Sequence, residues 1–159
     1  GGGRIAVVLS RGMSFGSVSM RAYGCYPGRT VPYPGAAGTL FTRRADQGVG
    51  YGTIRVDNRG VQTSTNITTP IPPDVSVDPA LSVRYVVLVV TNAARAEIAQ
   101  DVTLGDLYLC DDTSRLHLNG HTLTLRAQYH PDWGTTNRVV YDGGRIIWTQ
   151  PESILLQIF

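Results

Sequence analysis

The chain contains no lysine and almost no glutamate. All fourteen basic residues are arginine, and ten of the twelve acidic residues are aspartate, which leaves Glu97 and Glu152 as the only glutamates. Lysine and glutamate usually cover exposed helix faces, because their straight side chains lose little rotamer freedom there. Their near absence predicts a chain with few helices. The one helical candidate, residues 92–100, is rich in alanine but long enough for barely two turns.

Long apolar runs are missing as well. No stretch approaches the roughly 18 residues that a membrane-spanning helix requires, and the longest dense run, residues 85–90, has the length of a strand. With 42% hydrophobic and 16% charged residues, the composition is that of a folded domain. We therefore predict a single domain over residues 1–159 with no membrane span.

Cysteine is scarce, and its spacing excludes two common sites. Cys25 and Cys110 lie far apart, and there is no C-x-x-C pair, which excludes a zinc ribbon and a thioredoxin-like site. In an oxidising compartment the two residues can form one long-range disulfide, worth roughly 4 kcal/mol on the chain-entropy model. The alternative is a pair of small buried thiols. The sequence leaves both open.

Charge of one sign is not concentrated anywhere in the sequence. The net charge is +2, and the arginines are scattered along the chain. Nucleic-acid binding usually requires basic residues that cluster. We therefore expect no nucleic-acid partner.

The common catalytic sequences are also absent. There is no G-x-S-x-G, no P-loop and no G-x-G-x-x-G between a strand and a helix, and the glycine run 48–52 leads into a predicted strand. Glycoside hydrolysis needs two carboxylates across a cleft, for which Asp132 beside Trp133, with Trp148 as a stacking platform, is a candidate. Packed aromatic side chains are the preferred interpretation of Tyr141 and Trp148. We expect no catalytic residues, no cofactor and no enzyme activity.

The three histidines, His117, His121 and His130, invite a metal site. The spacing of His117 and His121 would place both rings on one face of a helix, but this segment is predicted to be β structure. A zinc site also needs more ligands close by. We therefore expect solvent-facing histidines and no metal ligands.

Four aspartates fall at predicted corners: Asp101, Asp106, Asp111 and Asp112. Carboxylates and loop carbonyls can bind calcium, but neither a D-x-D-x-D-G loop nor a G-G-x-G-x-D repeat is present. Aspartate is also a common turn residue, because its side chain accepts hydrogen bonds from nearby backbone amides. The turn role is the preferred interpretation.

The sequence does contain many short strand signals between glycine- and proline-rich turns. Residues 1–61 form a glycine-rich β part with expected strands at 5–9, 17–23, 39–42 and 53–57. Residues 62–80, rich in proline and threonine, are predicted to be a connection or an edge segment, because proline cannot donate to a strand ladder.

Residues 81–159 are more regular. Aliphatic residues occur in pairs separated by one residue, which places both side chains on one face of a strand: Val102 and Leu104, Leu107 and Leu109, Leu116 and Leu118, Leu123 and Leu125. Further strands are expected at 139–141, 145–148 and 154–159. This pattern predicts the coils of a β-solenoid similar to a right-handed parallel β-helix. The alternative is a β-sandwich of hairpins, because Asn119–Gly120 is also a hairpin signal.

Several strings resemble known sequences. They are GGGRIA at residues 1–6, AYG at 22–24, GAAGTLF at 35–41 and YGTIRVDN at 51–58. This set resembles a glycine-rich module of very large bacterial surface or secreted proteins. The string LHLNGHTLTL at 116–125 looks like parallel β-helix coils of autotransporter passengers and related adhesins. Cys25 and Ala36 depart from the pattern, because glycine is expected at both positions.

The resemblance implies an extracellular or cell-surface location and a structural or adhesive role, and it brings no catalytic residues. The domain is expected to be a self-assembling unit or a module of a larger surface protein. Its expected partners are other protein subunits, including copies of itself, flanking domains and glycans. The alternative is a carbohydrate-binding or polysaccharide-cleaving β-helix domain.

The two ends of the sequence are apolar and strand-like. Residues 1–9 and 154–159 can extend the sheet of a neighbouring subunit, or they can pair with each other inside the fold. No targeting signal is recognisable at residues 1–3. We expect either a processed chain or a piece of a longer one.

Overall fold

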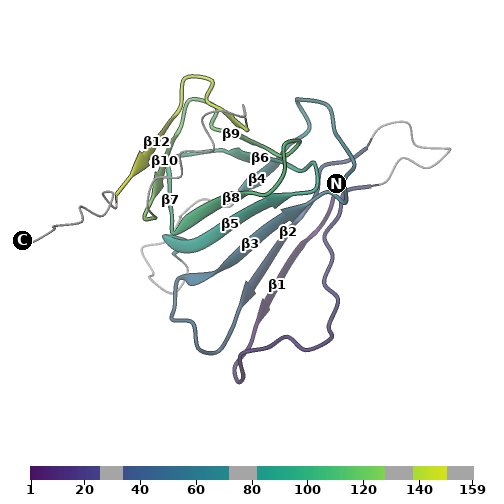
Figure 1. Cartoon of the computed structure of the whole chain (residues 1–159), viewed down its shortest axis with the longest axis vertical. Helices are drawn as coiled ribbons and strands as arrows, with labels where there is room; N and C mark the ends of the chain where they lie inside the picture. The colour runs from purple at the N-terminus through teal and green to yellow at the C-terminus, as the bar shows by residue number, and fades with distance from the viewer. Residues whose placement is uncertain (26–33, 72–81, 128–137, 150–159) are drawn as a thin grey trace, which may run out of the picture.

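The structure, a computed structural model, describes residues 1–25, 34–71, 82–127 and 138–149. These residues contain twelve β-strands in three sheets and no helix (Figure 1). The all-β prediction is therefore confirmed. Valine, isoleucine, leucine and threonine dominate the strands, and they alternate between buried and outward positions as a half-buried sheet requires.

The largest sheet has five strands in the order β1-β2-β3-β5-β8 (Figure 1). Its strands are β1 (Arg4–Val8), β2 (Thr39–Arg43), β3 (Tyr51–Asp57), β5 (Tyr85–Thr91) and β8 (Asp106–Leu109). Neighbours run parallel except for β2 and β3, which are antiparallel.

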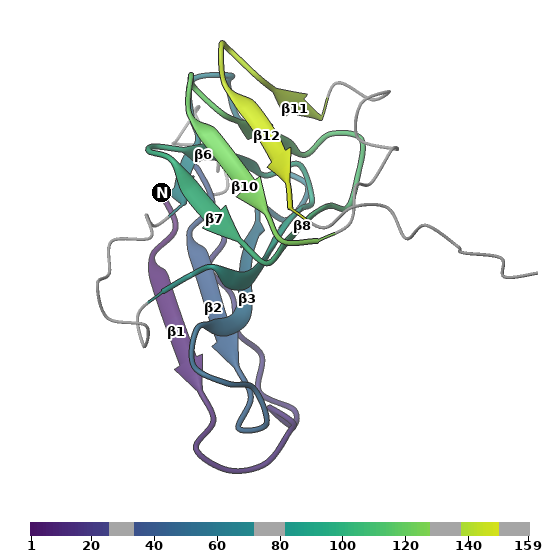
Figure 2. The same cartoon turned by 90° about the vertical axis from the view of Figure 1, so that its left-hand side faces the viewer.

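The other two sheets are entirely parallel. The three-stranded sheet, seen in Figure 2, has the order β12-β10-β7 and contains β7 (Val102–Leu104), β10 (Thr122–Leu125) and β12 (Arg145–Trp148). The four-stranded sheet has the order β11-β9-β6-β4 and contains β4 (Thr69–Ile71), β6 (Arg95–Ile98), β9 (Arg115–His117) and β11 (Val139–Val140).

The predicted β-solenoid is wrong for this chain. In a solenoid each coil adds one strand to every sheet, whereas the sheets here hold five, three and four strands and none of them is closed. The first half of the chain explains the difference, because β1, β2 and β3 all join one sheet and β2 pairs antiparallel with β3. The β-sandwich alternative fits only weakly, since this is the one antiparallel pair among the described strands.

The helical candidate at residues 92–100 is also wrong. Asn92 and Ala93 have φ angles of 55° and 61°, which end β5 in a left-handed corner. The chain then continues into β6, and Ala94 before this strand and Ala96 within it are both fully buried. Burial of these small side chains in the sheet outweighs the helix propensity of alanine, which is a weak preference.

The Asn119–Gly120 pair makes a corner and not a hairpin. Both residues have positive φ angles, 50° and 81°, as a tight turn requires. However, the strands on either side belong to different sheets, β9 to the four-stranded and β10 to the three-stranded sheet. The turn therefore redirects the chain from one sheet to the next. The same geometry recurs at Asp142–Gly143, between β11 and β12.

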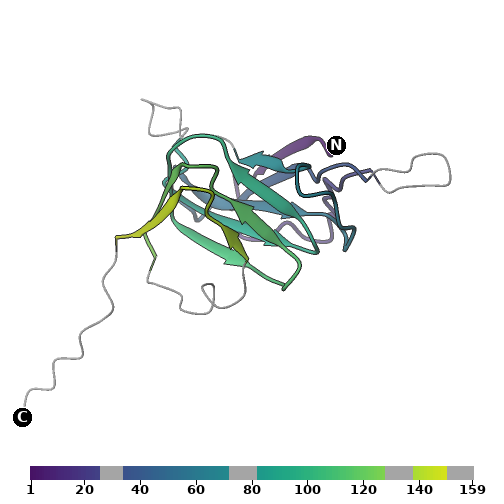
Figure 3. The ribbon, with the colours of Figure 1, turned by 90° about the horizontal axis from the view of Figure 1, so that it is seen from above.

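Aliphatic side chains in register build the core. Leu88 of β5 pairs with Leu107 of β8, and Leu104 of β7 pairs with Leu125 of β10, and all four are fully buried. The buried cluster contains residues from all three sheets, whose ribbons are seen from above in Figure 3. The predicted burial of the eight paired aliphatic residues in the second half is confirmed. Each leucine contributes about 2 kcal/mol through its burial.

The glycine-rich strings of the first half meet at one place, which we call the glycine node. A Cβ atom on Gly2, Gly24 or Gly38 would overlap backbone atoms of another segment. Hydrogen bonds join the same segments, from the Gly38 amide to the Ala22 carbonyl at 2.6 Å and from the Gly24 amide to the Asn58 side chain at 3.2 Å. The node joins residues 1–3, 22–25 and 35–38 through their backbones.

The strands expected at residues 17–23 and 154–159 are not found among the described strands. Residues 17–23 form no strand, although they alternate in sequence. The strand expected at 154–159 lies outside the described residues. In the part of the chain that is described, no helix has the length and apolar character needed to cross a membrane.

Candidate functional site

Polar side chains gather on the four-stranded sheet and line a hollow of about 610 Å³. We call it the polar groove. Its lining residues are Thr65, Asn66, Thr68, Arg95, Glu97, Arg115, His117, Asn119, Val140 and Asp142. They come from β6, β9 and β11 and from the segments beside these strands and before β4. Figure 1 shows β4, β6 and β9 next to one another.

Strand alternation places these side chains outward. Ala96 of β6 and Leu116 of β9 are fully buried in the core, and successive residues of a strand point to opposite faces of its sheet. The outward residues are therefore Arg95 and Glu97 on β6 and Arg115 and His117 on β9.

The first row across these strands consists of arginines. Arg95 pairs directly with Arg115. Val139 pairs with Leu116, the residue that follows Arg115. Arg138, which precedes Val139, therefore lies beside Arg115 and continues the row. Neighbouring strands are about 4.8 Å apart, so three guanidinium-bearing side chains begin within about 10 Å of one another.

Little negative charge offsets this row among the described residues. Arg138 forms an ion pair with Asp112, and its Nη1 donates to the Leu109 carbonyl at 3.0 Å. Arg115 Nη1 donates to two backbone carbonyl oxygens, at 2.6 and 2.8 Å. No group in the described parts of the chain accepts a hydrogen bond from Arg95. Arg95 and Arg115 therefore form no ion pair with an acidic group among the described residues.

The second row is acidic and polar. Glu97 pairs with His117, which pairs with Val140. Asn119 Nδ2 donates to Glu97 Oε2 at 3.2 Å, and His117 Nδ1 lies 4.0 Å from Asp142 Oδ2. The groove thus changes from cationic to acidic along the strand direction, over about 6.7 Å.

Burial and neighbouring charges lower the pKa of His117 in the second row and the pKa of Arg95 in the first. Burial lowers the pKa of His117, and the Arg95 charge lowers it further against the opposing effect of Asp142. The ring is therefore neutral at pH 7, and its Nε2 is buried without a hydrogen-bond partner among the described residues. Burial and the Arg115 charge lower the pKa of Arg95, which remains protonated at this pH.

Sequence analysis missed this site because the arginines are scattered along the chain. The structure brings Arg95, Arg115 and Arg138 into one row. The signal that could have found them is a shared pattern, in which an arginine opens each of the segments RAEI, RLHL and RVVY and a buried aliphatic residue follows. Aligning these segments side by side would have placed the arginines together.

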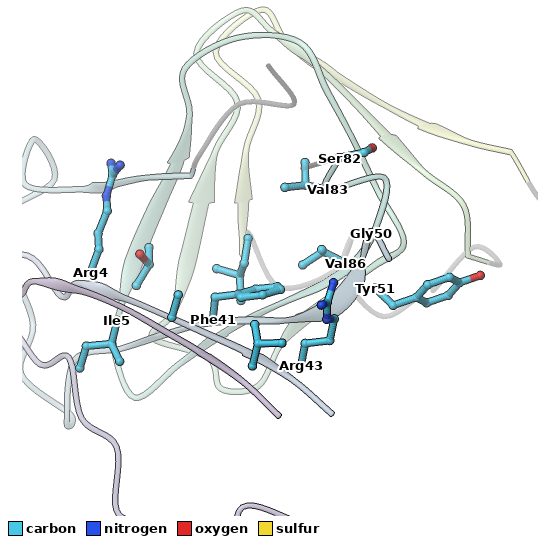
Figure 4. Close-up of a pocket in the computed structure, with 13 residues that line it drawn as sticks. Arg4, Ile5, Phe41, Arg43, Gly50, Tyr51, Ser82, Val83 and Val86 are labelled. Carbon is cyan, nitrogen blue, oxygen red and sulfur yellow. The ribbon is translucent and has the colours of Figure 1, made fainter. Parts of the chain in front are cut away.

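A second hollow, of about 490 Å³, lies on the five-stranded sheet (Figure 4). Phe41, Ile54 and Val86 contribute apolar walls, and Arg4 and Arg43 also line the hollow. Its walls suit an apolar group. The glycine run 48–52 contributes to this hollow as it leads into β3.

The predicted histidines do not come together. His117 lies in the polar groove, whereas His121 lies at the corner before β10, 3.6 Å from Asp101. His130 is outside the described residues. Within the described ranges, no three histidine, cysteine, aspartate or glutamate side chains are grouped as a metal-ligand set.

The corner aspartates accept backbone hydrogen bonds. Asp101 Oδ1 accepts from the Thr122 amide at 2.8 Å, and Asp106 Oδ1 accepts from the Leu107 amide at 2.8 Å. The Asp101 contact joins two segments that are 21 residues apart, and Asp106 lies in β8, so the turn interpretation stays a prediction for these two aspartates.

Asp111 makes the densest set of contacts. Its Oδ1 accepts from the amides of Thr113 and Ser114 at 3.1 and 2.9 Å, and from the Thr113 hydroxyl at 2.6 Å. Its Oδ2 accepts from the Asn92 amide at 2.6 Å and the Ser114 hydroxyl at 2.8 Å. Burial raises the pKa of Asp111, but these hydrogen bonds outweigh it and lower the pKa to about 2. Asp111 therefore joins the corner after β5 to the corner after β8.

The cysteines and aromatic residues have mixed outcomes. Cys25 and Cys110 are both exposed and form no disulfide in the structure, which differs from the buried-thiol alternative; the disulfide stays a prediction.

Trp148 packs against the core, as expected, but Tyr141 is 48% exposed. The carboxylate candidate Asp132, with its neighbouring tryptophan, lies outside the described residues.

Comparison with protein-family profiles, curated proteins and solved structures finds no match to this chain. The resemblance to glycine-rich bacterial surface modules therefore stays a prediction, as do the role and the location that it implies. The geometry of the polar groove supplies the strongest argument about function.

Proposed function

We propose that the chain is a non-catalytic adhesive domain of the extracellular space or cell surface and that it binds glycans through the polar groove. The observation that carries this proposal is the pair of rows on β6 and β9, where charged and hydrogen-bonding side chains stand in register. Sugar hydroxyls both donate and accept hydrogen bonds. A groove that offers guanidinium donors, carboxylate acceptors and amides suits such a ligand.

The framework supports a binding role. Side chains on paired strands keep fixed spacings, and binding sites built on strands are more accurately positioned than sites on loops. The residues beneath the rows, Ala96 and Leu116, are fully buried. The backbone positions of the groove residues on β6 and β9 are therefore fixed before a ligand arrives, which lowers the entropy lost on binding.

Filling the groove should abolish glycan binding. Val140→Trp places a bulky side chain beside His117 in the groove, and we expect at least about a tenfold loss of glycan binding, since the ligand loses its space. The measurement is a glycan array followed by titration of the retained glycan. Val18→Trp is the matched control, because Val18 is 65% exposed and does not line the groove.

A reducing-sugar assay on the same glycans tests the non-catalytic part of the proposal. We expect binding without release of new reducing ends. Release by the wild-type chain would instead favour the polysaccharide-cleaving alternative. Unchanged binding by Val140→Trp would contradict the placement of the site in the groove.

A second proposal concerns assembly through β1. Among the described strands, β1 pairs only with β2, so its other edge presents backbone amides and carbonyls. The Gly3 carbonyl accepts a hydrogen bond from the Thr39 amide, and the Leu9 amide donates one to the Arg43 carbonyl. The backbone groups of the odd-numbered residues of β1 therefore face β2. The even residues then face the open edge, and Val8 is 47% exposed. Such an edge can take a strand from another copy of the chain.

Ala6→Pro should abolish assembly without unfolding the chain. Proline removes an amide that points away from β2, which an edge strand tolerates. We expect the wild type to form oligomers in light scattering and the variant to remain a folded monomer. Ile5→Pro is the comparison, because it removes an amide that faces β2 and should destabilise the fold. A wild-type chain that stays monomeric at high concentration would contradict the proposal.

A further inference from the structure

We propose that the polar groove selects acidic saccharides and that Arg95 and Arg115 bind the carboxylate or sulfate group of the sugar. This inference rests on the glycan-binding function proposed above. It adds the charge of the ligand and the two residues that recognise it.

The positions of the two arginines carry the inference. They occupy paired positions on adjacent parallel strands and both line the groove. Like charges placed side by side repel each other, and no acidic group among the described residues forms an ion pair with either one. A bound oxyanion would relieve this repulsion and satisfy the guanidinium donors at once.

The orientation of Arg115 suits an oxyanion. Its Nη1 is fixed by the carbonyl oxygens of Asp112 and Ser114. Guanidinium is planar and carries five N–H donors, so the remaining donors of Arg115 are available in a side chain that is already ordered. Planar, bidentate recognition of carboxylates and similar anions is the geometry in which arginine binds most strongly.

The second row supplies hydrogen-bond acceptors for the hydroxyl groups of a saccharide. Glu97 and Asp142 line the same groove, about 6.7 Å from the arginine row along the strands. Their carboxylates would accept hydrogen bonds from the hydroxyl groups of a sugar whose acidic group lies at the arginines. The distance between the rows is on the scale of one hexose ring.

The experiment compares acidic and neutral polymers of the same sugar. The probes are polygalacturonate, its fully methyl-esterified form, sulfated dextran and unmodified dextran. We expect the wild-type chain to bind polygalacturonate, sulfated dextran or both, and to bind the two neutral probes at least about tenfold more weakly. Comparing the first and third probes separates a carboxylate from a sulfate ligand. Single-stranded DNA serves as the polyanion without sugar carboxylates.

Variants assign the selectivity to the two arginines. Arg95→Gln and Arg115→Gln should each weaken binding of the acidic probe at least about tenfold, and Arg95→Lys should recover part of the loss because it restores charge without the planar donors. Arg44→Gln is the control, since it removes the same charge from a surface ion pair with Asp46. Circular dichroism and urea midpoints verify that the variants fold.

The outcomes separate the two proposals. Equal binding of neutral and acidic probes, or unchanged binding in both arginine variants, overturns the acidic-saccharide inference and leaves glycan binding intact. Binding of DNA at the strength of the acidic glycan, with the same dependence on Arg95, overturns the inference in favour of general polyanion binding. Failure to bind any saccharide on the array overturns both proposals.

Discussion

Replacing Gly38 with alanine is expected to prevent the chain from reaching its native fold. The added Cβ atom would overlap the carbonyl oxygen of Gly3, which is held in place by a hydrogen bond from the Thr39 amide at 3.2 Å. Backbone atoms in a paired segment cannot move aside as the end of a flexible side chain can. We expect either loss of the native circular dichroism spectrum or a fall in unfolding free energy of more than about 4 kcal/mol in urea.

Gly3→Ala is the matched control in the same string. Nothing lies within 4 Å of a Cβ atom at Gly3, so we expect a change below about 0.5 kcal/mol. Gly24→Ala should behave like Gly38→Ala, because its Cβ atom would overlap the Gly35 carbonyl. Equal urea midpoints for Gly3→Ala and Gly38→Ala would show that the segments of the glycine node do not approach as closely as described.

The result would also assign a role to the glycine-rich strings. The strings at 1–6, 22–24 and 35–41 supply the glycines of the node, and the string at 51–58 supplies the buried Asn58, which is 2% exposed. Asn58 accepts from the Gly24 amide and donates to the Val61 carbonyl at 2.5 Å. Their shared feature is therefore close backbone packing, which is a structural requirement.

Asp111→Ala is expected to lower the unfolding free energy by about 3 kcal/mol. The substitution removes five hydrogen bonds and leaves Ser114, which is fully buried, without its partner. Buried groups that lose a charged partner cost on the order of 1–3 kcal/mol. Asp46→Ala is the control, because Asp46 belongs to an exposed ion pair with Arg44 and should cost less than about 1 kcal/mol.

Acid titration tests the same residue independently. The pKa of Asp111 is lowered from 3.8 to about 2 in the folded chain. At pH values above its ordinary pKa, its carboxylate therefore makes its full contribution to the stability of the fold. That contribution is lost as the pH falls from about 4 to about 2. We expect the unfolding free energy of the wild type to fall over this range and that of Asp111→Asn to fall less. Parallel pH profiles for the two proteins would contradict this role.

The local structure of the second half followed from its sequence. The paired aliphatic residues predicted strands that face a core, and all eight are buried. This prediction succeeded because the two-residue period of a strand is a local property, set by the backbone itself. The Asn119–Gly120 turn and the contacts of Asp111 with Thr113 and Ser114 were also predictable, since their chemistry acts within a few residues.

The sequence alone could not show which sheet each strand joins. The spacing of the strands is compatible with coils, with hairpins and with separate sheets, and the choice depends on which distant strands pair. The antiparallel pairing of β2 with β3 is one such long-range choice. The helical candidate failed for a similar reason, because the environment of Ala94 and Ala96 in the core outweighed their local preference.

The sequence by itself determined an all-β chain of short alternating strands with polar corners. Only the tertiary structure decided that Arg95, Arg115 and Arg138 form one row beside Glu97 and His117. The physical reason is that parallel pairing brings together residues from separate strands, at a spacing of about 4.8 Å. Each arginine is an ordinary surface residue in the sequence, and the register of the strands makes them a candidate site.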